Sequence, residues 1–224
     1  MKVTFLGQYG FFIEAGRAKI LLDPYLSDHC GSLNPAKRRR VPLDEKWFSV
    51  RPDLLLFTHD HLDHYDPETA PRFLLAYPGM TVFSPKSVWE KAREVTKDQN
   101  FVLAEPGTRW TEKGVSLRAV KAFHSDPYAV GFRIEAEGKS LYFTGDTLYN
   151  DAIFASLPGA PDAVFLPVNG AGNNMNFEDG AAFAVKCGAK RVFPCHCGML
   201  DDLDPAAFPL ETKEILTPYG TVEI

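Results

Sequence analysis

The chain has 224 residues, a formal net charge of −5 and a hydrophobic content of 45%. This length and content are typical of one globular domain with a sizeable core, spanning 1–224, and they argue against disorder. The negative charge argues against a general nucleic-acid binder. No apolar run reaches the roughly 18 residues that a membrane span needs. The amino terminus has the pattern of a strand ending at glycine rather than that of a signal peptide. We therefore expect a cytoplasmic protein without a membrane partner, and the composition leaves a homo-oligomer open.

The four cysteines support the same compartment. Cys195 and Cys197 are two residues apart, and no second such pair is present. This spacing supports neither a disulfide framework nor a four-thiolate zinc site, so we expect reduced cysteines that pack rather than bind metal.

The first quarter of the chain predicts a small antiparallel meander. Short apolar segments at 3–6, 11–14 and 19–22 are separated by glycines, as in strands joined by tight turns. Residues 24–50 are polar, contain proline and show little periodicity; a connection of this length is often functional. An apolar strand is then predicted at 53–57.

Strands and helices alternate in the remainder of the chain. Asp66-Pro67 and Ser84-Pro85 each have the pattern of a helix start, and Asn176 and Gly188 bracket a helix at 177–187. Further strands are predicted at 81–83, 101–103, 115–121, 128–134, 140–144, 163–167 and 191–194, and Asp204-Pro205 opens a last short helix. These elements predict an α/β fold, an αββα sandwich of two mixed β-sheets with helices on the outer faces. No internal repeat is visible.

A cluster of histidines follows the strand predicted at 53–57. The segment from Thr58 to Asp66 reads THDHLDHYD and contains three of the six histidines. Histidine is the commonest metal ligand near neutral pH. The spacing of His59, His61 and His64 cannot direct all three rings to one point from a helix or a strand, but a loop just beyond a strand can do so.

Three other ligand-type residues also lie just beyond predicted strands. His124 follows the strand ending near residue 121, Asp146 follows the segment Phe143-Thr144-Gly145, and His196 follows the strand ending at 194. A rigid sheet that holds functional groups at its strand ends is a common arrangement. These positions account for five of the six histidines; His29 is left as a loop residue, with a substrate-facing role kept open.

The ordered set His59-x-His61-x-Asp63-His64, His124, Asp146 and His196 resembles the metallo-β-lactamase-fold hydrolases over essentially the whole chain. Three segments further resemble the L-ascorbate-6-phosphate lactonase-like branch: Leu22-Asp23-Pro24-Tyr25-Leu26, Leu166-Pro167-Val168-Asn169-Gly170 with Asn174-Met175, and Pro194-Cys195-His196-Cys197-Gly198-Met199.

The resemblance implies two divalent metal ions, zinc or manganese. His59, His61 and His124 would hold one ion, Asp63, His64 and His196 the other, and Asp146 would bridge them together with a hydroxide. Asp63 and Asp146 are thereby the expected catalytic carboxylates, with Asp63 either a ligand or the group that orients the attacking water. Metal binding lowers the pKa of water from 15.7 to roughly 7, which supplies hydroxide at neutral pH.

Two segments and one aspartate are candidates for supporting roles. The basic run Lys37, Arg38, Arg39 and Arg40 is either a solvated loop or a receptor for an anionic substrate. Asn169, Asn173 and Asn174 lie in a glycine-rich segment that is either a plain turn or a source of amide donors. Asp23 either caps a turn or accepts a hydrogen bond from a ligating histidine. Asp60 is expected to point away from the metals.

These observations predict a hydrolase that uses a metal-bridging hydroxide on a small anionic substrate, such as a (phospho)sugar lactone or a similar ester. A phosphodiesterase or small nuclease on the same metal platform is the alternative within enzymes. A metal-dependent ligand-binding regulator without turnover is the alternative of a different class. The complete ligand set argues against the regulator, because lost catalysis usually shows as lost ligands.

Overall fold

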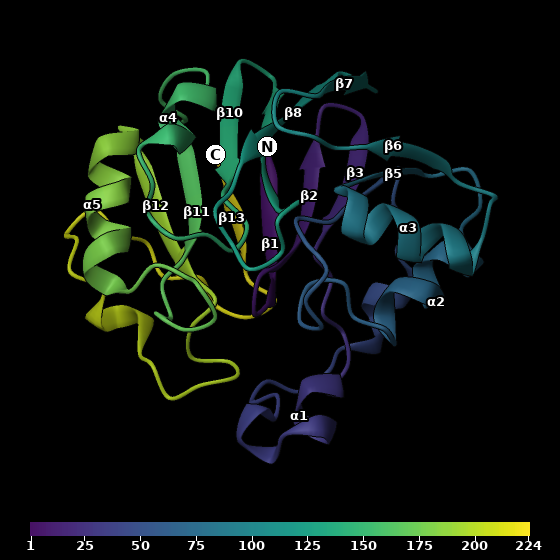
Figure 1. Ribbon diagram of the computed structural model, residues 1–224, viewed down its shortest axis with the longest axis horizontal. Helices are drawn as coiled ribbons and strands as arrows, with labels where there is room; N and C mark the ends of the chain where they lie inside the picture. Colours follow the sequence, from purple (N-terminus) through teal and green to yellow (C-terminus); the bar gives the residue numbers. More distant parts are fainter.

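Two β-sheets lie face to face in the computed structural model, which describes residues 1–224, and helices cover their outer faces (Figure 1). The first sheet has the order β13 (Thr221–Glu223), β1 (Lys2–Gly7), β2 (Gly10–Ala15), β3 (Ala18–Leu22), β4 (Leu54–Leu56), β5 (Thr81–Ser84) and β6 (Asn100–Leu103). The second has the order β12 (Arg191–Cys195), β11 (Ala163–Pro167), β10 (Lys139–Phe143), β9 (Val130–Ala136), β8 (Val115–Lys121) and β7 (Arg109–Glu112). The predicted αββα sandwich is confirmed.

Both sheets combine an antiparallel and a parallel part. In the first sheet, β1, β2 and β3 are antiparallel, and β3 to β6 are parallel. In the second, β8, β9 and β10 are antiparallel, and β10 to β12 are parallel. Polar residues that follow the parallel strands therefore gather at one edge of the sandwich, where ligands commonly bind in α/β proteins.

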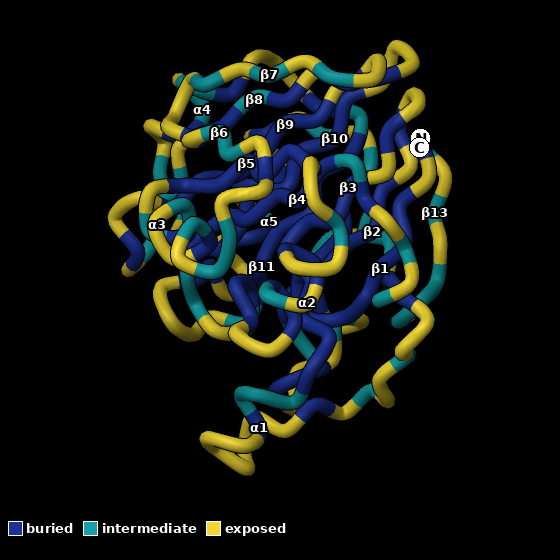
Figure 2. Tube along the Cα trace, turned by 90° about the vertical axis from the view of Figure 1, so that its right-hand side faces the viewer, coloured by how far each residue is buried: buried dark blue, intermediate teal, exposed yellow.

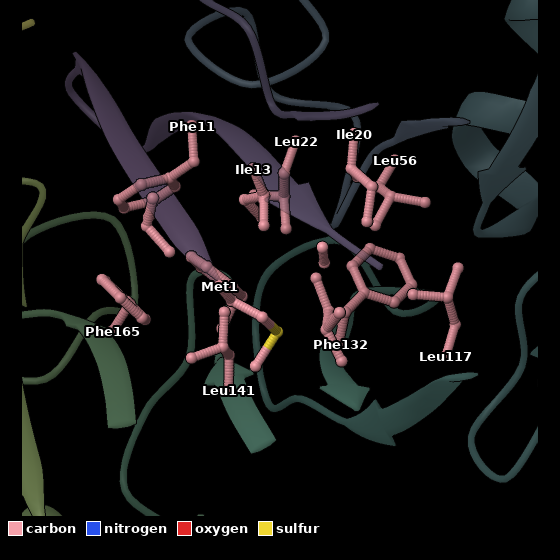
Figure 3. Packing of buried hydrophobic residues seen from close by; sticks show 14 of the residues in the cluster. Met1, Phe11, Ile13, Ile20, Leu22, Leu56, Leu117, Phe132, Leu141 and Phe165 are labelled. Carbon is pink, nitrogen blue, oxygen red and sulfur yellow. The ribbon is translucent and has the colours of Figure 1, made fainter. Parts of the chain in front are cut away.

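A core of 28 buried residues fills the space between the sheets. Figure 3 shows Phe11, Ile13 and Leu22 of the first sheet facing Phe132 and Leu141 of the second. Alternate residues of these strands point inward, because strand side chains have a period of two. Each buried aliphatic or aromatic side chain contributes about 1.5–3 kcal/mol to stability, so this layer holds the two sheets in a fixed relation.

Two further apolar layers lie between the sheets and the helices. Helices α2 (Thr69–Ala76) and α3 (Lys86–Val95) pack on the first sheet, and α4 (Ala152–Ser156) and α5 (Phe177–Cys187) pack on the second. The helix α5 has the predicted bounds: Asn176 Oδ1 accepts a hydrogen bond from the Asp179 N–H, and Gly188 ends the helix with φ of 67°.

The structure corrects some of the predicted elements. Helix α2 begins at Thr69, two residues after Pro67, because the Asp66 carboxylate accepts hydrogen bonds from the Glu68 N–H and the Thr69 hydroxyl. Residues 24–50 contain helix α1 (His29–Leu33) and 3₁₀ turns at Pro35–Lys37 and Glu45–Ser49, and a third 3₁₀ turn lies at Pro205–Ala207. His29 is the first residue of α1 rather than a loop residue, and its ring lies 3.0 Å from the Glu68 carboxylate. The short strands β7 and β13 and helix α4 were not predicted.

The strand β13 brings the end of the chain back to its beginning. It pairs with β1, and the terminal residues Met1 and Ile224 exchange backbone hydrogen bonds of 3.2 and 3.0 Å. Figure 2 shows the two termini side by side, at the opposite end of the molecule from α1. Every helix of the structure falls short of the length and hydrophobicity that a membrane crossing requires.

Candidate metal centre

The histidine cluster lies on the loop that follows β4, as predicted. The rings of His59 and His64 are fully buried, with centroids 4.0 Å apart. Gly145, at the end of β10, lets this loop approach closely: a Cβ there would lie 2.8 Å from the Thr58 Cβ and 2.9 Å from the Val130 carbonyl oxygen. Only glycine therefore fits at this contact, and it also adopts φ of 62° without strain.

Two sets of ligand-type atoms converge on Asp146. The first set comprises His59, His61, His124 and Asp146, and the second comprises Asp63, His64 and His196; within each set all ligand atoms lie within 4.8 Å of one another. The carboxylate of Asp146 lies 3.9 Å from His59 Nε2, 3.3 Å from His64 Nε2 and 3.3 Å from His196 Nε2. The structure thus brings all seven predicted metal ligands together, with Asp146 between the two sets.

Unpartnered atoms show that the centre fits divalent cations. His59 Nε2, His64 Nε2 and Asp146 Oδ1 are buried and accept or donate no hydrogen bond within the protein. Buried polar atoms normally have a partner, because leaving one without it costs about 1–3 kcal/mol. Imidazole nitrogens and carboxylate oxygens are the donors that zinc and manganese accept, and cations held by the two sets would satisfy all three atoms.

The charge state of the centre follows from burial and from its carboxylates. Burial holds the pKa of His59 well below its ordinary value, so this ring is neutral and has a lone pair to offer. Burial also lowers the pKa of His124. Burial alone would lower the pKa of His64 as well, but the carboxylates of Asp146 and Asp23 outweigh it and raise that pKa well above the ordinary value.

Side chains behind the ligands fix their orientation. Asp23 Oδ2 lies 2.8 Å from His64 Nδ1, so Nε2 of that ring is free to face the centre, and Asp23 also accepts hydrogen bonds from the Thr58 N–H and hydroxyl. The Asn173 carbonyl oxygen lies 3.2 Å from His124 Nδ1, and the Asn174 amide donates to Asp146 at 2.7 Å. Such contacts set the tautomer and direction of metal ligands.

Gln8 also belongs to the centre, although no sequence motif indicated it. Its amide nitrogen donates to Asp63 Oδ2 at 2.8 Å and lies 3.1 Å from His196 Nε2. Gln8 adopts φ of 54°, uncommon for a non-glycine residue, directly after β1. Its position just past a strand end, which it shares with the ligands, is the signal that could have found it.

A pocket of about 170 Å³ opens beside Asp63 and His196. The other residues around it are Gln8, Cys30, Lys37, Asn169, Leu200 and Asp201. Burial raises the pKa of the Cys30 thiol to about 11, so it is uncharged at neutral pH and is not a thiolate nucleophile. Lys37 is the member of the basic run that faces this pocket.

The remaining residues of the basic run have other partners. Arg39 is buried, and its guanidinium donates to the carbonyl oxygens of Tyr25, Leu6 and Val41 and to the Tyr219 hydroxyl. These bonds fasten the 24–50 segment to the first sheet and engage the guanidinium of Arg39 within the protein. Arg38 and Arg40 are paired at the surface with Asp28 and Asp202.

The structure also gives the positions of the remaining side chains that the sequence singled out. Asp60 points away from the centre, as expected, and pairs with Lys91 Nζ at 2.7 Å. Cys195 is buried in the layer between the sheets, and Cys197 is partly buried in the layer under α5; neither belongs to the groups of ligand-type residues. Asn169 faces the pocket, and its Oδ1 lies 3.4 Å from the Ala171 N–H.

Comparison with known proteins agrees with this geometry. Residues 18–197 match the model of the beta-lactamase superfamily domain. The chain belongs to this superfamily. A UPF0173 metal-dependent hydrolase of Pelotomaculum thermopropionicum is 30% identical over the full length of both chains, and one of Korarchaeum cryptofilum is 32% identical over 88% of this chain and 82% of its own. The protein is therefore a metal-dependent hydrolase of the superfamily, and the resemblance of its sequence to the metallo-β-lactamase-fold hydrolases is confirmed.

Solved structures extend the likeness to the fold. A metallo hydrolase of the hyperthermophilic archaeon Ignicoccus hospitalis superposes with a TM-score of 0.78 at 24% identity, covering 99% of this chain and 97% of its own. At this identity the similarity concerns the sandwich and the course of the chain.

Proposed function

We propose that this hydrolase holds two divalent ions and cleaves a small anionic ester, with a phosphorylated sugar lactone as the representative substrate. The observation that carries the proposal is the convergence of two ligand sets on the buried, partly unpartnered carboxylate of Asp146. One ion would be held by His59, His61 and His124, the other by Asp63, His64 and His196. Bound divalent ions of this kind lower the pKa of water to roughly 7 and polarise the bond to be broken.

The protein's own residues would hold the reacting groups in place. Gln8 fixes the Asp63 carboxylate, and the Asn173 carbonyl fixes the His124 ring. Prior positioning of this kind lowers a reaction barrier, because the side chains already have their reactive orientation before the reaction begins. The uncharged Cys30 thiol argues against a covalent cysteine route. Zinc and manganese both suit these nitrogen and oxygen donors.

The ligand assignment is tested by metal content. His61→Ala combined with Asp146→Asn removes one ligand of the first set and the carboxylate shared by both. We expect purified variant protein to retain less than one metal equivalent by elemental analysis, against two in the wild type, and to lose turnover. Asp60→Asn is the matched control, since that carboxylate lies in the same loop but pairs with Lys91. Two retained equivalents in the double variant would contradict the assignment.

The substrate class is tested at Lys37. Lys37 lines the pocket beside Asp63 and His196, where its ammonium would pair with an anionic group of the substrate. Lys37→Gln should raise KM for a phosphorylated lactone about tenfold and leave kcat within about twofold, because an ion pair made equally in the ground and transition states changes binding alone. Arg38→Gln, whose side chain pairs with Asp28 at the surface, is the control. An unchanged KM in Lys37→Gln would overturn the anionic substrate.

A substrate screen separates the remaining alternatives. Lactones, phosphodiesters and thioesters should be offered to the same metal-loaded preparation. Turnover of phosphodiesters alone would replace the lactone proposal with a phosphodiesterase on the same centre. Tight binding of one ligand without turnover of any class would indicate a regulator.

A further inference from the structure

A row of three arginines crosses the outer face of the second sheet, away from the metal centre. Arg109 of β7 lies opposite Arg118 of β8, which in turn lies opposite Arg133 of β9. Their side chains share one face of the sheet, and residues directly opposite each other have Cβ atoms about 4.5–5.5 Å apart. Like charges in this arrangement repel one another, and the row contains more positive charge than the neighbouring Glu135 carboxylate offsets.

The arginines surround a cavity rather than spread over a flat surface. A cavity of about 390 Å³ is bounded by the three arginines together with Thr111, Ser116, Leu117, Glu135 and Pro158. Its volume is within the range of small-molecule sites. Helix α5 packs on β11, helix α4 packs against β8, and the edge strand β7 extends the sheet beyond them (Figure 1). The cavity shares no residue with the metal centre.

Two of the arginines offer donors that the protein leaves without an acceptor. Arg133 has only 8% of its side chain exposed; its Nε donates to Glu135 at 2.6 Å and its Nη1 to the Gly159 carbonyl at 2.9 Å. These bonds fix the guanidinium and leave Nη2 without a protein acceptor. Arg118 Nε is buried and has no hydrogen-bond partner. A buried donor without an acceptor is costly, and it indicates a group that the protein itself does not supply.

Charge and donor type define the ligand. Three guanidinium groups against the single carboxylate of Glu135 leave two positive charges, which match the charge of −1.5 to −2 of a phosphate monoester at neutral pH. Guanidinium groups bind phosphate oxygens in a bidentate manner, and the hydroxyls of Thr111 and Ser116 add donors at the rim. The cavity is larger than a phosphate group alone, so it has room for the molecule that carries it.

From this juxtaposition we infer that the outer face of β7 to β9 is a second binding site, which takes the phosphate group of a small phosphate monoester. The site is independent of the proposed reaction, because none of its residues touches the metal ligands or the pocket beside them.

Titration calorimetry on the metal-loaded protein tests the site. The probe is a hexose phosphate at pH 8, with the unphosphorylated hexose and chloride at equal ionic strength as negative controls. Arg118→Gln and Arg109→Gln should each weaken binding about tenfold or more, since each removes a charge-assisted donor. Arg109 is exposed on the edge strand β7, so its replacement leaves the fold intact if Arg118→Gln should fail to fold. Arg17→Gln, an exposed arginine on the turn between β2 and β3, should leave binding unchanged.

The location and the source of the phosphate are decided by two further measurements. His61→Ala should retain a binding site for the hexose phosphate whatever happens at the metal centre; loss of all binding there would place the anion at the metal centre and overturn the proposal. Inorganic phosphate should bind more weakly than the hexose phosphate, and equal affinity would overturn the assignment of an esterified phosphate. Unchanged affinity in both arginine variants would overturn the site altogether.

Discussion

The strands β1 to β5 and the strands β8 to β12 have the same connectivity but supply different parts of the metal centre. In each half, three antiparallel strands lead into two further parallel strands. Asp23 follows the third strand of the first half, and Asp146 follows the third strand of the second. The His59–His64 loop follows the fourth strand of the first half, and the asparagine-rich segment follows the fourth strand of the second.

The two aspartates show how equivalent positions acquire different tasks. Both approach His64: Asp23 lies 2.8 Å from Nδ1, and Asp146 lies 3.3 Å from Nε2, on the other side of the ring. Both oxygens of Asp23 accept hydrogen bonds or face the His64 ring, whereas Asp146 Oδ1 accepts no hydrogen bond and has only the His64 ring beside it. The hydrogen bonds that Asp23 accepts favour a role in orienting His64, and the oxygen of Asp146 without a hydrogen bond is open to a cation. The difference therefore lies in the hydrogen bonds around each carboxylate.

The most severe test of this comparison is Asp146→Asn. The substitution keeps the size of the side chain but removes the charge shared by both ligand sets. We expect kcat/KM to fall by about 10³-fold or more, since a metal ion contributes several kcal/mol to the transition state. Elemental analysis should show loss of bound metal in parallel. Full metal occupancy with wild-type kinetics would show that Asp146 is no more than a buried structural carboxylate.

Asp23→Asn should have a smaller effect. Asparagine tolerates the φ of 42° at this position but removes the charge that holds the His64 ring. Contacts behind a metal ligand change metal affinity by about 10–100-fold, and we expect a loss of this size in competition with a chelator. The thermal midpoint of the metal-free variant shows whether Asp23 acts on metal binding or on the stability of the fold. A lowered midpoint with unchanged metal affinity in the folded protein would reduce Asp23 to a stabilising residue.

The sequence alone was sufficient for much of this centre. His59, His61, Asp63 and His64 form one contiguous loop, and His124, Asp146 and His196 each follow a recognisable strand. Local pattern marked these residues as candidates, and the resemblance to the metallo-β-lactamase-fold hydrolases implied that they meet. The alternation of apolar residues likewise predicted most strands of both sheets, because burial of one strand face leaves a direct mark on the sequence.

Contacts between distant segments could not be predicted in this way. Arg39 bonds to Tyr219, 180 residues away, and nothing in a run of four basic residues distinguishes the one that is buried. Gln8, which no motif indicated, donates to Asp63, 55 residues away. The short strand β13 forms only because the end of the chain returns to β1. Such features depend on the assembled fold rather than on local propensity.

The smallest effect of a substitution is expected at the starts of β4 and β11, opposite the ends that hold the candidate metal centre. Asp53 and Asp162 lie just before the fourth strand of each half and accept the backbone N–H of Lys19 and Ser140, respectively, at 2.8 Å. A lysine pairs with each: Lys113 with Asp53 and Lys190 with Asp162. The Lys190 ammonium and the Ser140 N–H lower the pKa of Asp162 to about 2. The pKa of Asp53 is also lowered, although burial opposes the effect of Lys113 there.

Asp162→Asn should therefore cost about 1 kcal/mol of unfolding free energy at pH 7, a typical value for a surface charge pair. The folded-state pKa lies below the ordinary value of 3.8, so the stabilisation is complete above that pH and disappears as the pH falls through about 2. Urea unfolding between pH 2 and 7 measures the difference, and the exposed Asp98→Asn should show none. Asp53→Asn should lose stability in the same direction. A difference between wild type and Asp162→Asn that did not shrink between pH 4 and pH 2 would mean that lost packing, not lost charge, accounts for it. The two halves would then differ at their strand starts as they do at their strand ends.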